Sequence, residues 1–149
     1  MAYRAIESCF KYKKIVLGCV AASFCLTVFS MINNAETVSA ADQLKLSTAI
    51  LCEDVQNRQP QNAGVVFSIS SGQIYCYTLF DPVPEQTTIY HNWYSRDTLT
   101  SRVKLQLQPP RWTTYSTIQL RESDKGPWRV EITDANGNVL QVLRFSVTE

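Results

Sequence analysis

Hydrophobic and polar residues alternate with a period of two along most of the chain after residue 42. In the segment VKLQL, Val103, Leu105 and Leu107 fall on one side, and the polar residues between them fall on the other. This alternation is typical of a β-strand that buries one face. It predicts seven or eight strands, within residues 44–52, 65–69, 73–80, 87–94, 103–107, 115–120, 128–133 and 139–147.

Short segments rich in turn-forming residues separate these predicted strands, namely SSG, DPVPEQ, QPPRW, SDKGP and DANGN. Asn136 and Gly137 give the strongest hairpin signal, because both residues tolerate the positive φ that a tight turn needs. No helical periodicity of any length follows residue 42. The pattern therefore predicts an all-β fold, an antiparallel β-sandwich of immunoglobulin-like size, with a closed barrel as the alternative.

The first 40 residues differ from the rest. Four basic residues and one acidic residue precede an uncharged apolar run at residues 15–32, which is the pattern of an export signal. The small residues Val38 and Ala40 predict cleavage after residue 40, which leaves residues 41–149 as one domain. An uncleaved run of 18 residues would span roughly 27 Å as a helix and could anchor the chain in a membrane. Either outcome predicts an exported domain.

The predicted domain is close to neutral. Residues 41–149 contain ten Lys and Arg residues and eleven Asp and Glu residues, a net charge of −1. The basic excess that is usual for proteins that bind nucleic acid is missing. We therefore expect no nucleic-acid partner, and contact with a membrane only through residues 15–32 if they are retained.

Several aromatic blocks occur in a characteristic order, namely RQP, IYCYTLF, IYHNWY, RWTTYST, GPWRVEITDANGNVL and RFSV. Over most of Ala49 to Val147 these blocks resemble the bacterial family known as domain of unknown function 2914 (DUF2914). The resemblance implies a small exported or membrane-tethered β domain of the bacterial envelope, in the periplasm or on the outer face of the inner membrane. It implies no reaction and no catalytic residue.

The only histidine, His91, is the first candidate for chemistry. Together with Asp97 and Ser116 it supplies the residue types of a hydrolase triad, but Ser116 lacks the glycine elbow of such nucleophiles. Cys52, Cys76 and His91 could supply three zinc ligands, but they lack the close C-x-x-C spacing of zinc sites. We expect no enzyme activity, no metal and no cofactor, and a hydrolase that uses His91 remains the alternative.

The alternation in TIYHNWY gives His91 a structural interpretation. Ile89, His91 and Trp93 share one face, and that face should pack inward. A buried ring must hydrogen-bond, for example to a backbone carbonyl or to the hydroxyl of Ser116 or Thr114, and burial should lower its pKa. Structural roles are expected for His91, Trp93, Trp112 and Trp128.

A set of tyrosines is the candidate binding surface. They lie in the predicted strands at the positions that point away from the expected core, and they are Tyr75, Tyr77, Tyr90, Tyr94 and Tyr115. A face of tyrosines suits sugars, peptides or another domain, because each ring offers an apolar surface and one polar group. Tyrosine also has a high β propensity, so simple cross-strand pairing is the alternative.

The predicted domain contains two cysteines, Cys52 and Cys76, and the alternation places both at inward positions of predicted strands. In an oxidising compartment such a pair is expected to form a disulfide, worth roughly 3 kcal/mol for a loop of this length. Two separate buried thiols are the alternative. Taken together, these features predict a non-catalytic binding or interaction module of the bacterial cell envelope, with a protein or glycan as its partner.

Overall fold

A computed structural model of the chain describes residues 43–149. The expected signal peptide or anchor, residues 1–40 with the apolar run 15–32, lies outside the described residues. Among residues 43–149, no helix has both the length and the apolar character needed to cross a membrane.

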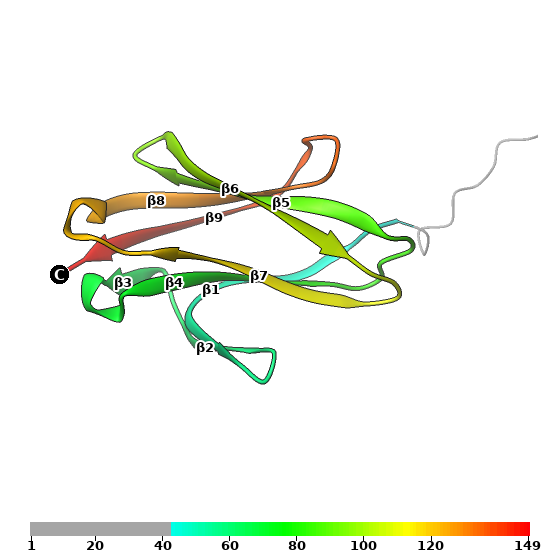
Figure 1. Ribbon diagram of the computed structural model, residues 1–149, viewed down its shortest axis with the longest axis horizontal. Helices are drawn as coiled ribbons and strands as arrows, with labels where there is room; N and C mark the ends of the chain where they lie inside the picture. The colour runs from blue at the N-terminus through cyan, green and yellow to red at the C-terminus, as the bar shows by residue number, and fades with distance from the viewer. Residues whose placement is uncertain (1–42) are drawn as a thin grey trace, which may run out of the picture. The chain divides into compact units, whose positions relative to one another are not determined.

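The domain consists of two β-sheets, which form two layers in Figure 1. Sheet A has the strand order β2-β1-β4-β7, and sheet B has the order β3-β9-β8-β5-β6. The strands of sheet A are β2 (Gln59–Ala63), β1 (Leu46–Gln56), β4 (Gln73–Phe80) and β7 (Trp112–Gln119). The strands of sheet B are β3 (Val66–Ser68), β9 (Val139–Thr148), β8 (Gly126–Thr133), β5 (Thr87–Ser95) and β6 (Thr98–Leu107). The fold is therefore a two-sheet sandwich and not a closed barrel.

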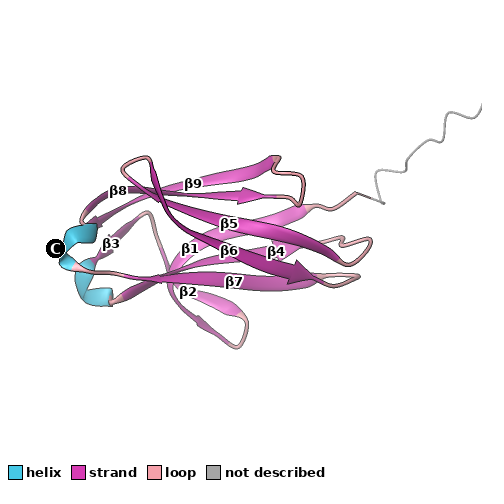
Figure 2. Cartoon of the chain, turned by 45° about the horizontal axis from the view of Figure 1, so that its top comes forward, coloured by secondary structure: helices cyan, strands magenta, loops and turns pink. Residues whose placement is uncertain are grey.

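Two short 3-10 helices, η2 (Ile69–Ser71) and η3 (Glu122–Asp124), lie at one end of the sandwich in Figure 2. The all-β prediction is confirmed, but the predicted number of strands is too low, because nine strands are present among the described residues. The additional strand, β2, has the sequence QPQNA, which carries no hydrophobic alternation. A two-residue turn creates it, since Asn57 and Arg58 both adopt positive φ between paired residues of β1 and β2.

The prediction of a purely antiparallel sandwich is also wrong in one place. β3 runs parallel to β9, with Val66, Phe67 and Ser68 opposite residues 146–148. The chain reaches this position because residues 64 and 65 cross from the edge of sheet A to the edge of sheet B. All other strand pairs are antiparallel.

Aromatic rings fill one end of the core. The ring of Phe145 on β9 stacks on Trp128, with 6.0 Å between ring centroids. It also meets the rings of Phe67 and Trp93 edge to face, at 5.9 and 6.1 Å. Such aromatic contacts add to the stabilisation that burial of the same rings provides. Trp93 and Trp128 therefore both belong to the core.

The expected disulfide between Cys52 and Cys76 is wrong, because both residues are buried free thiols. The register of β1 against β4 changes between Leu46 and Thr48, which shifts the inward positions that follow by one residue. Leu51 now lies opposite Cys76 and faces the core, whereas Cys52 lies opposite Tyr75. The two thiols therefore leave opposite faces of sheet A, and no disulfide can join them without backbone movement.

Candidate functional site

The five candidate tyrosines do not form one surface. Tyr75, Tyr77 and Tyr115 belong to β4 and β7 and lie on the outer face of sheet A. Tyr90 and Tyr94 belong to β5 and lie on the outer face of sheet B. Since the two layers pack through their inner faces, the two groups point away from each other. The expectation of a single tyrosine face is therefore wrong.

The three tyrosines on sheet A are largely engaged with their neighbours. The rings of Tyr75 and Tyr115 meet edge to face at 5.7 Å. Tyr77 is buried and donates its hydroxyl to the backbone carbonyl of Arg58 at the tip of the β1–β2 hairpin, at 3.1 Å. The Gln73 amide donates to the Tyr75 hydroxyl at 2.8 Å. Of the three, only Tyr115 is exposed, and its exposed fraction is 49%.

The outer face of sheet B combines tyrosines with cations. Strand pairing aligns Arg102 of β6 with Asn92 of β5, and Lys104 with Tyr90. It likewise aligns Tyr94 of β5 with Arg129 of β8, and Arg129 with Arg144 of β9. We call this surface the basic face and define it by six residues, Tyr90, Tyr94, Arg102, Lys104, Arg129 and Arg144.

Two arginines of the basic face lie over the rings of its tyrosines. The guanidinium carbon of Arg102 is 4.1 Å from the ring centroid of Tyr90. The guanidinium carbon of Arg129 is 4.0 Å from that of Tyr94. Such a cation–π contact favours one orientation of each guanidinium.

The cations of the basic face differ in their ion pairing. Arg129 is fixed by ion pairs with Asp97 and with Glu131, and the hydrogen bond that it donates to Glu131 is the main cause of its raised pKa. No acidic side chain within residues 43–149 forms an ion pair with Arg102, Lys104 or Arg144. These three side chains are exposed. The face therefore has a positive surplus although the domain as a whole is nearly neutral.

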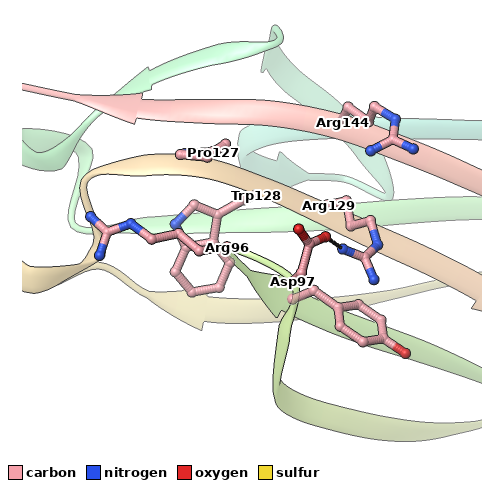
Figure 3. A pocket seen from close by; sticks show the side chains of 7 residues that line it. Arg96, Asp97, Pro127, Trp128, Arg129 and Arg144 are labelled. Atoms are coloured by element: carbon pink, nitrogen blue, oxygen red, sulfur yellow. Dashed lines mark hydrogen bonds and ion pairs between the residues drawn. The ribbon is translucent and has the colours of Figure 1, made fainter.

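A hollow of about 150 Å³ lies at one end of the basic face, where the β5–β6 turn meets β8 and β9. Figure 3 shows Arg129 and Asp97 facing each other in this hollow, with Arg96 and Arg144 on either side. Arg96 donates to the backbone carbonyl of Lys125 at 2.6 Å. Three guanidinium groups and one carboxylate thus line the hollow, and among the described residues only Arg129 pairs with that carboxylate.

A second hollow, of about 320 Å³, lies on the opposite side of the domain and is lined by Arg58, Arg111, Trp112 and Thr113. Trp112, for which a structural role is expected, is 38% exposed. It is the first residue of the edge strand β7 and lies opposite Phe80 at the end of sheet A, where no further strand covers it. Phe80 takes the buried position instead.

His91 is fully buried between the two sheets. Its Nδ1 atom lies 2.9 Å from the Ser116 hydroxyl on β7, and its Nε2 atom lies 3.4 Å from the Thr78 hydroxyl on β4. Thr78 donates its hydroxyl proton in a hydrogen bond to the backbone carbonyl of Thr114, so its oxygen accepts a hydrogen bond from Nε2–H of His91. Nδ1 is then unprotonated and accepts from Ser116. Burial lowers the pKa of His91 to about 4.

The structure brings together only two of the three residue types of the hydrolase triad. His91 and Ser116 are within hydrogen-bond distance, but Asp97 lies in the β5–β6 turn with its side chain 90% exposed and paired with Arg129. The three possible zinc ligands are also separated, because the Cys52 side chain projects from the outer face of sheet A while His91 lies in the core. Within residues 43–149, no group of three or more His, Cys, Asp or Glu side chains is placed to hold a metal ion.

Residues 86–147 match the family described as Protein of unknown function (DUF2914). The resemblance to this family is confirmed. The DUF2914 match begins after β4, so it is shorter than the resemblance expected from Ala49 onward. It contains β5 to β9 and therefore every residue of the basic face. No curated protein matches the chain.

Sequence reasoning missed the basic face. The signal was present, because Arg102, Lys104, Arg129 and Arg144 all occupy outward positions in alternating segments. The alternation does not indicate which strands are neighbours in a sheet. Only the pairing of β6, β5, β8 and β9 as neighbours gathers these cations beside Tyr90 and Tyr94.

Proposed function

We propose that this protein is a non-catalytic binding module that engages an anionic partner through the basic face. One observation carries the proposal: three exposed cations that have no ion-pair partner among residues 43–149 share one sheet face with two tyrosines that arginines cover. Oriented guanidinium groups recognise carboxylates and phosphates through paired N–H donors. Such groups occur on acidic glycans and on acidic protein surfaces, so both partner classes share this chemistry.

The surroundings of His91 support a binding role over the alternative of a hydrolase. A nucleophile and its base must reach a substrate, and a tetrahedral intermediate must find oxyanion donors. His91 is 0% exposed, and both of its ring nitrogens are occupied by Ser116 and Thr78. A substrate would have to separate the two sheets before it could contact the ring.

The proposal is tested by binding of defined polymers to the chain. Polygalacturonate supplies carboxylates on a glycan, poly-glutamate supplies them on a polypeptide, and neutral dextran is the reference. We expect one or both acidic polymers to bind in a salt-sensitive manner, because each contact is an exposed charge pair. Substitution of both Arg102→Gln and Lys104→Gln should weaken binding by about tenfold, as loss of about 1.4 kcal/mol would.

A matched variant controls for net charge. Arg58→Gln with Arg111→Gln also removes two positive charges, but these residues line the hollow on the sheet A side. Binding by this variant should stay within about twofold of the unmodified chain. Equal weakening by the two double variants would mean that only net charge matters, and no binding of either acidic polymer would contradict the proposal.

We further propose that the domain is exported to the bacterial envelope. The support is the basic flank and apolar run of residues 1–32 together with the small residues before position 41. Intact-mass measurement of the protein isolated from the envelope separates the two outcomes. A chain that begins at Ala41 indicates cleavage, and a chain that retains residues 1–40 indicates an anchor. A chain that is found only in the cytoplasm would contradict export.

A further inference from the structure

Exposed apolar side chains gather along β9 and the segment next to it. Of the eight large hydrophobic side chains that are exposed within residues 43–149, five lie here. They are Val65, Val66, Val139, Leu140 and Val142. An open hollow of about 320 Å³ lies beside Val65, with Ile50 and Leu143 also in its lining. Concentrated apolar surface of this kind marks a place of interaction with another chain.

Most of β9 also has one unpaired edge. β8 pairs with it from Val139 to Val147, whereas β3 pairs on its other side only with residues 146–148. The amide of Ser146 points toward that second side and donates to the carbonyl of Val65. Successive peptide groups of a strand point to alternate sides, so the amides of Arg144 and Val142 point to the same side. Within the described residues, no strand pairs with them there.

This edge lacks the features that protect two other edges of the domain, those of β2 and β6. The edge strand β2 is short and contains Pro60, and the edge strand β6 carries Arg102 and Lys104. Proline, charge and shortness all discourage the addition of another strand. Residues 139–143, with the sequence VLQVL, contain no proline and no charge. An unprotected apolar edge is a strand-addition site unless another chain covers it.

We propose that β9 pairs antiparallel with β9 of a second copy of this chain. The uncharged run of residues 139–143 can face itself without like charges meeting. Its flanks are complementary, because Arg144 lies at one end and Asp134, in the β8–β9 turn, lies at the other. The carboxylate of Asp134 accepts hydrogen bonds within this turn from the amides of Asn136 and Asn138, both at 2.8 Å. Antiparallel pairing brings Arg144 of each copy toward Asp134 of the second copy.

The resulting assembly has two-fold symmetry and an isologous interface. Two five-stranded B sheets join edge to edge, so the outer faces of both become one surface. The two basic faces then lie on the same side of the assembly. A repeating polyanion could contact both, which raises the apparent affinity without any new contact.

The mass of the full chain in solution, measured by light scattering without any ligand, tests the pairing. We expect the mass of two chains. Val142→Pro removes one edge amide and leaves the β8 ladder intact, so this variant should have the mass of one chain. Val142→Ala keeps the amide and should remain a dimer, with a dissociation constant raised by no more than about tenfold. Val142→Lys keeps the amide, adds a charge to the edge, and should also have the mass of one chain.

Thermal unfolding shows whether each variant is folded, and Val142→Lys keeps the test valid if Val142→Pro fails to fold. The mass of one chain for the unmodified protein would overturn the proposal. The mass of two chains for a folded Val142→Pro or Val142→Lys variant would also overturn it, because the copies would then meet through another surface. Because no ligand is present, this result is independent of the test of the basic face.

Discussion

The indole nitrogen of Trp93 on sheet B donates a hydrogen bond to the Ser116 hydroxyl on sheet A, at 3.0 Å. Ser116 in turn donates to Nδ1 of His91, which lies two residues from Trp93 on the same inner face. The Nε2–H of His91 donates to the Thr78 hydroxyl, which donates to the backbone carbonyl of Thr114. One chain of hydrogen bonds therefore joins the two layers through a core in which each of these polar groups has a partner.

Loss of the Ser116 hydroxyl should destabilise the domain strongly. Ser116→Ala leaves the Trp93 indole and the Nδ1 atom of His91 without partners inside the core. Each unpaired buried group costs about 1 to 3 kcal/mol, so the free energy of unfolding should fall by about 3 kcal/mol. Urea denaturation measures this change.

The neighbouring residue provides the control for this substitution. Thr117 lies on the same strand with its side chain exposed on the outer face. Thr117→Ala should change the free energy of unfolding by less than about 0.5 kcal/mol. If Ser116→Ala were equally mild, the hydrogen-bonded chain would not contribute to stability as described.

The domain should lose stability in mild acid because of His91. Burial lowers the pKa of the folded-state ring to about 4, below its unperturbed value of 6.5. Between these two values the unfolded chain takes up a proton that the folded chain does not. Stability is therefore fully present above pH 6.5, decreases as the pH falls toward 4, and decreases no further from this group below that. Between pH 7 and pH 5 the loss should be about 2 kcal/mol.

Other groups titrate in the same range, so the measurement needs a variant whose side chain at position 91 cannot take up a proton. His91→Gln keeps a polar side chain of similar size and has no proton to gain. It should be less stable than the unmodified chain at pH 7, and the difference between the two should shrink at pH 5. Denaturation curves that keep a constant difference at both pH values would contradict a lowered pKa for His91.

Both domain cysteines should react as free thiols once the protein is unfolded. Cys52 and Cys76 leave opposite faces of sheet A, and burial raises the pKa of each thiol. Native protein should therefore be labelled slowly at either residue. After denaturation without a reductant, peptide mass mapping should find the label on both. Two peptides joined by a disulfide between Cys52 and Cys76 would contradict the placement of Cys52 on the outer face of sheet A.

Alternation predicted the position of His91 but not that of Cys52. β5 keeps a constant pleat between Ile89 and Trp93, so counting by two places His91 in the core. β1 contains a bulge, and a bulge shifts every later residue to the other face. β1 contains no glycine at the bulge, so its sequence does not indicate where the bulge lies. Counting by two across it therefore put Cys52 on the wrong side.

Strand order limited what could be predicted about the site. The tyrosines were identified as outward residues, but whether Tyr77 and Tyr90 share a face depends on which sheet each strand joins. β4 and β5 are consecutive in the chain and belong to different sheets. Contacts between residues distant in the chain decide this assignment. For the same reason the cations of β6, β8 and β9 could be placed beside Tyr90 and Tyr94 only from the structure.

The most direct test of the binding proposal is a residue-resolved map of the contact surface. Backbone amide NMR signals of the chain are followed while an acidic polymer that binds it is added. We predict that the largest shifts fall on the amides of β5, β6 and β8 around Tyr90, Tyr94, Arg102 and Arg129. Shifts centred instead on Arg58 and Trp112, or spread evenly over both sheets, would contradict the assignment of binding to the basic face.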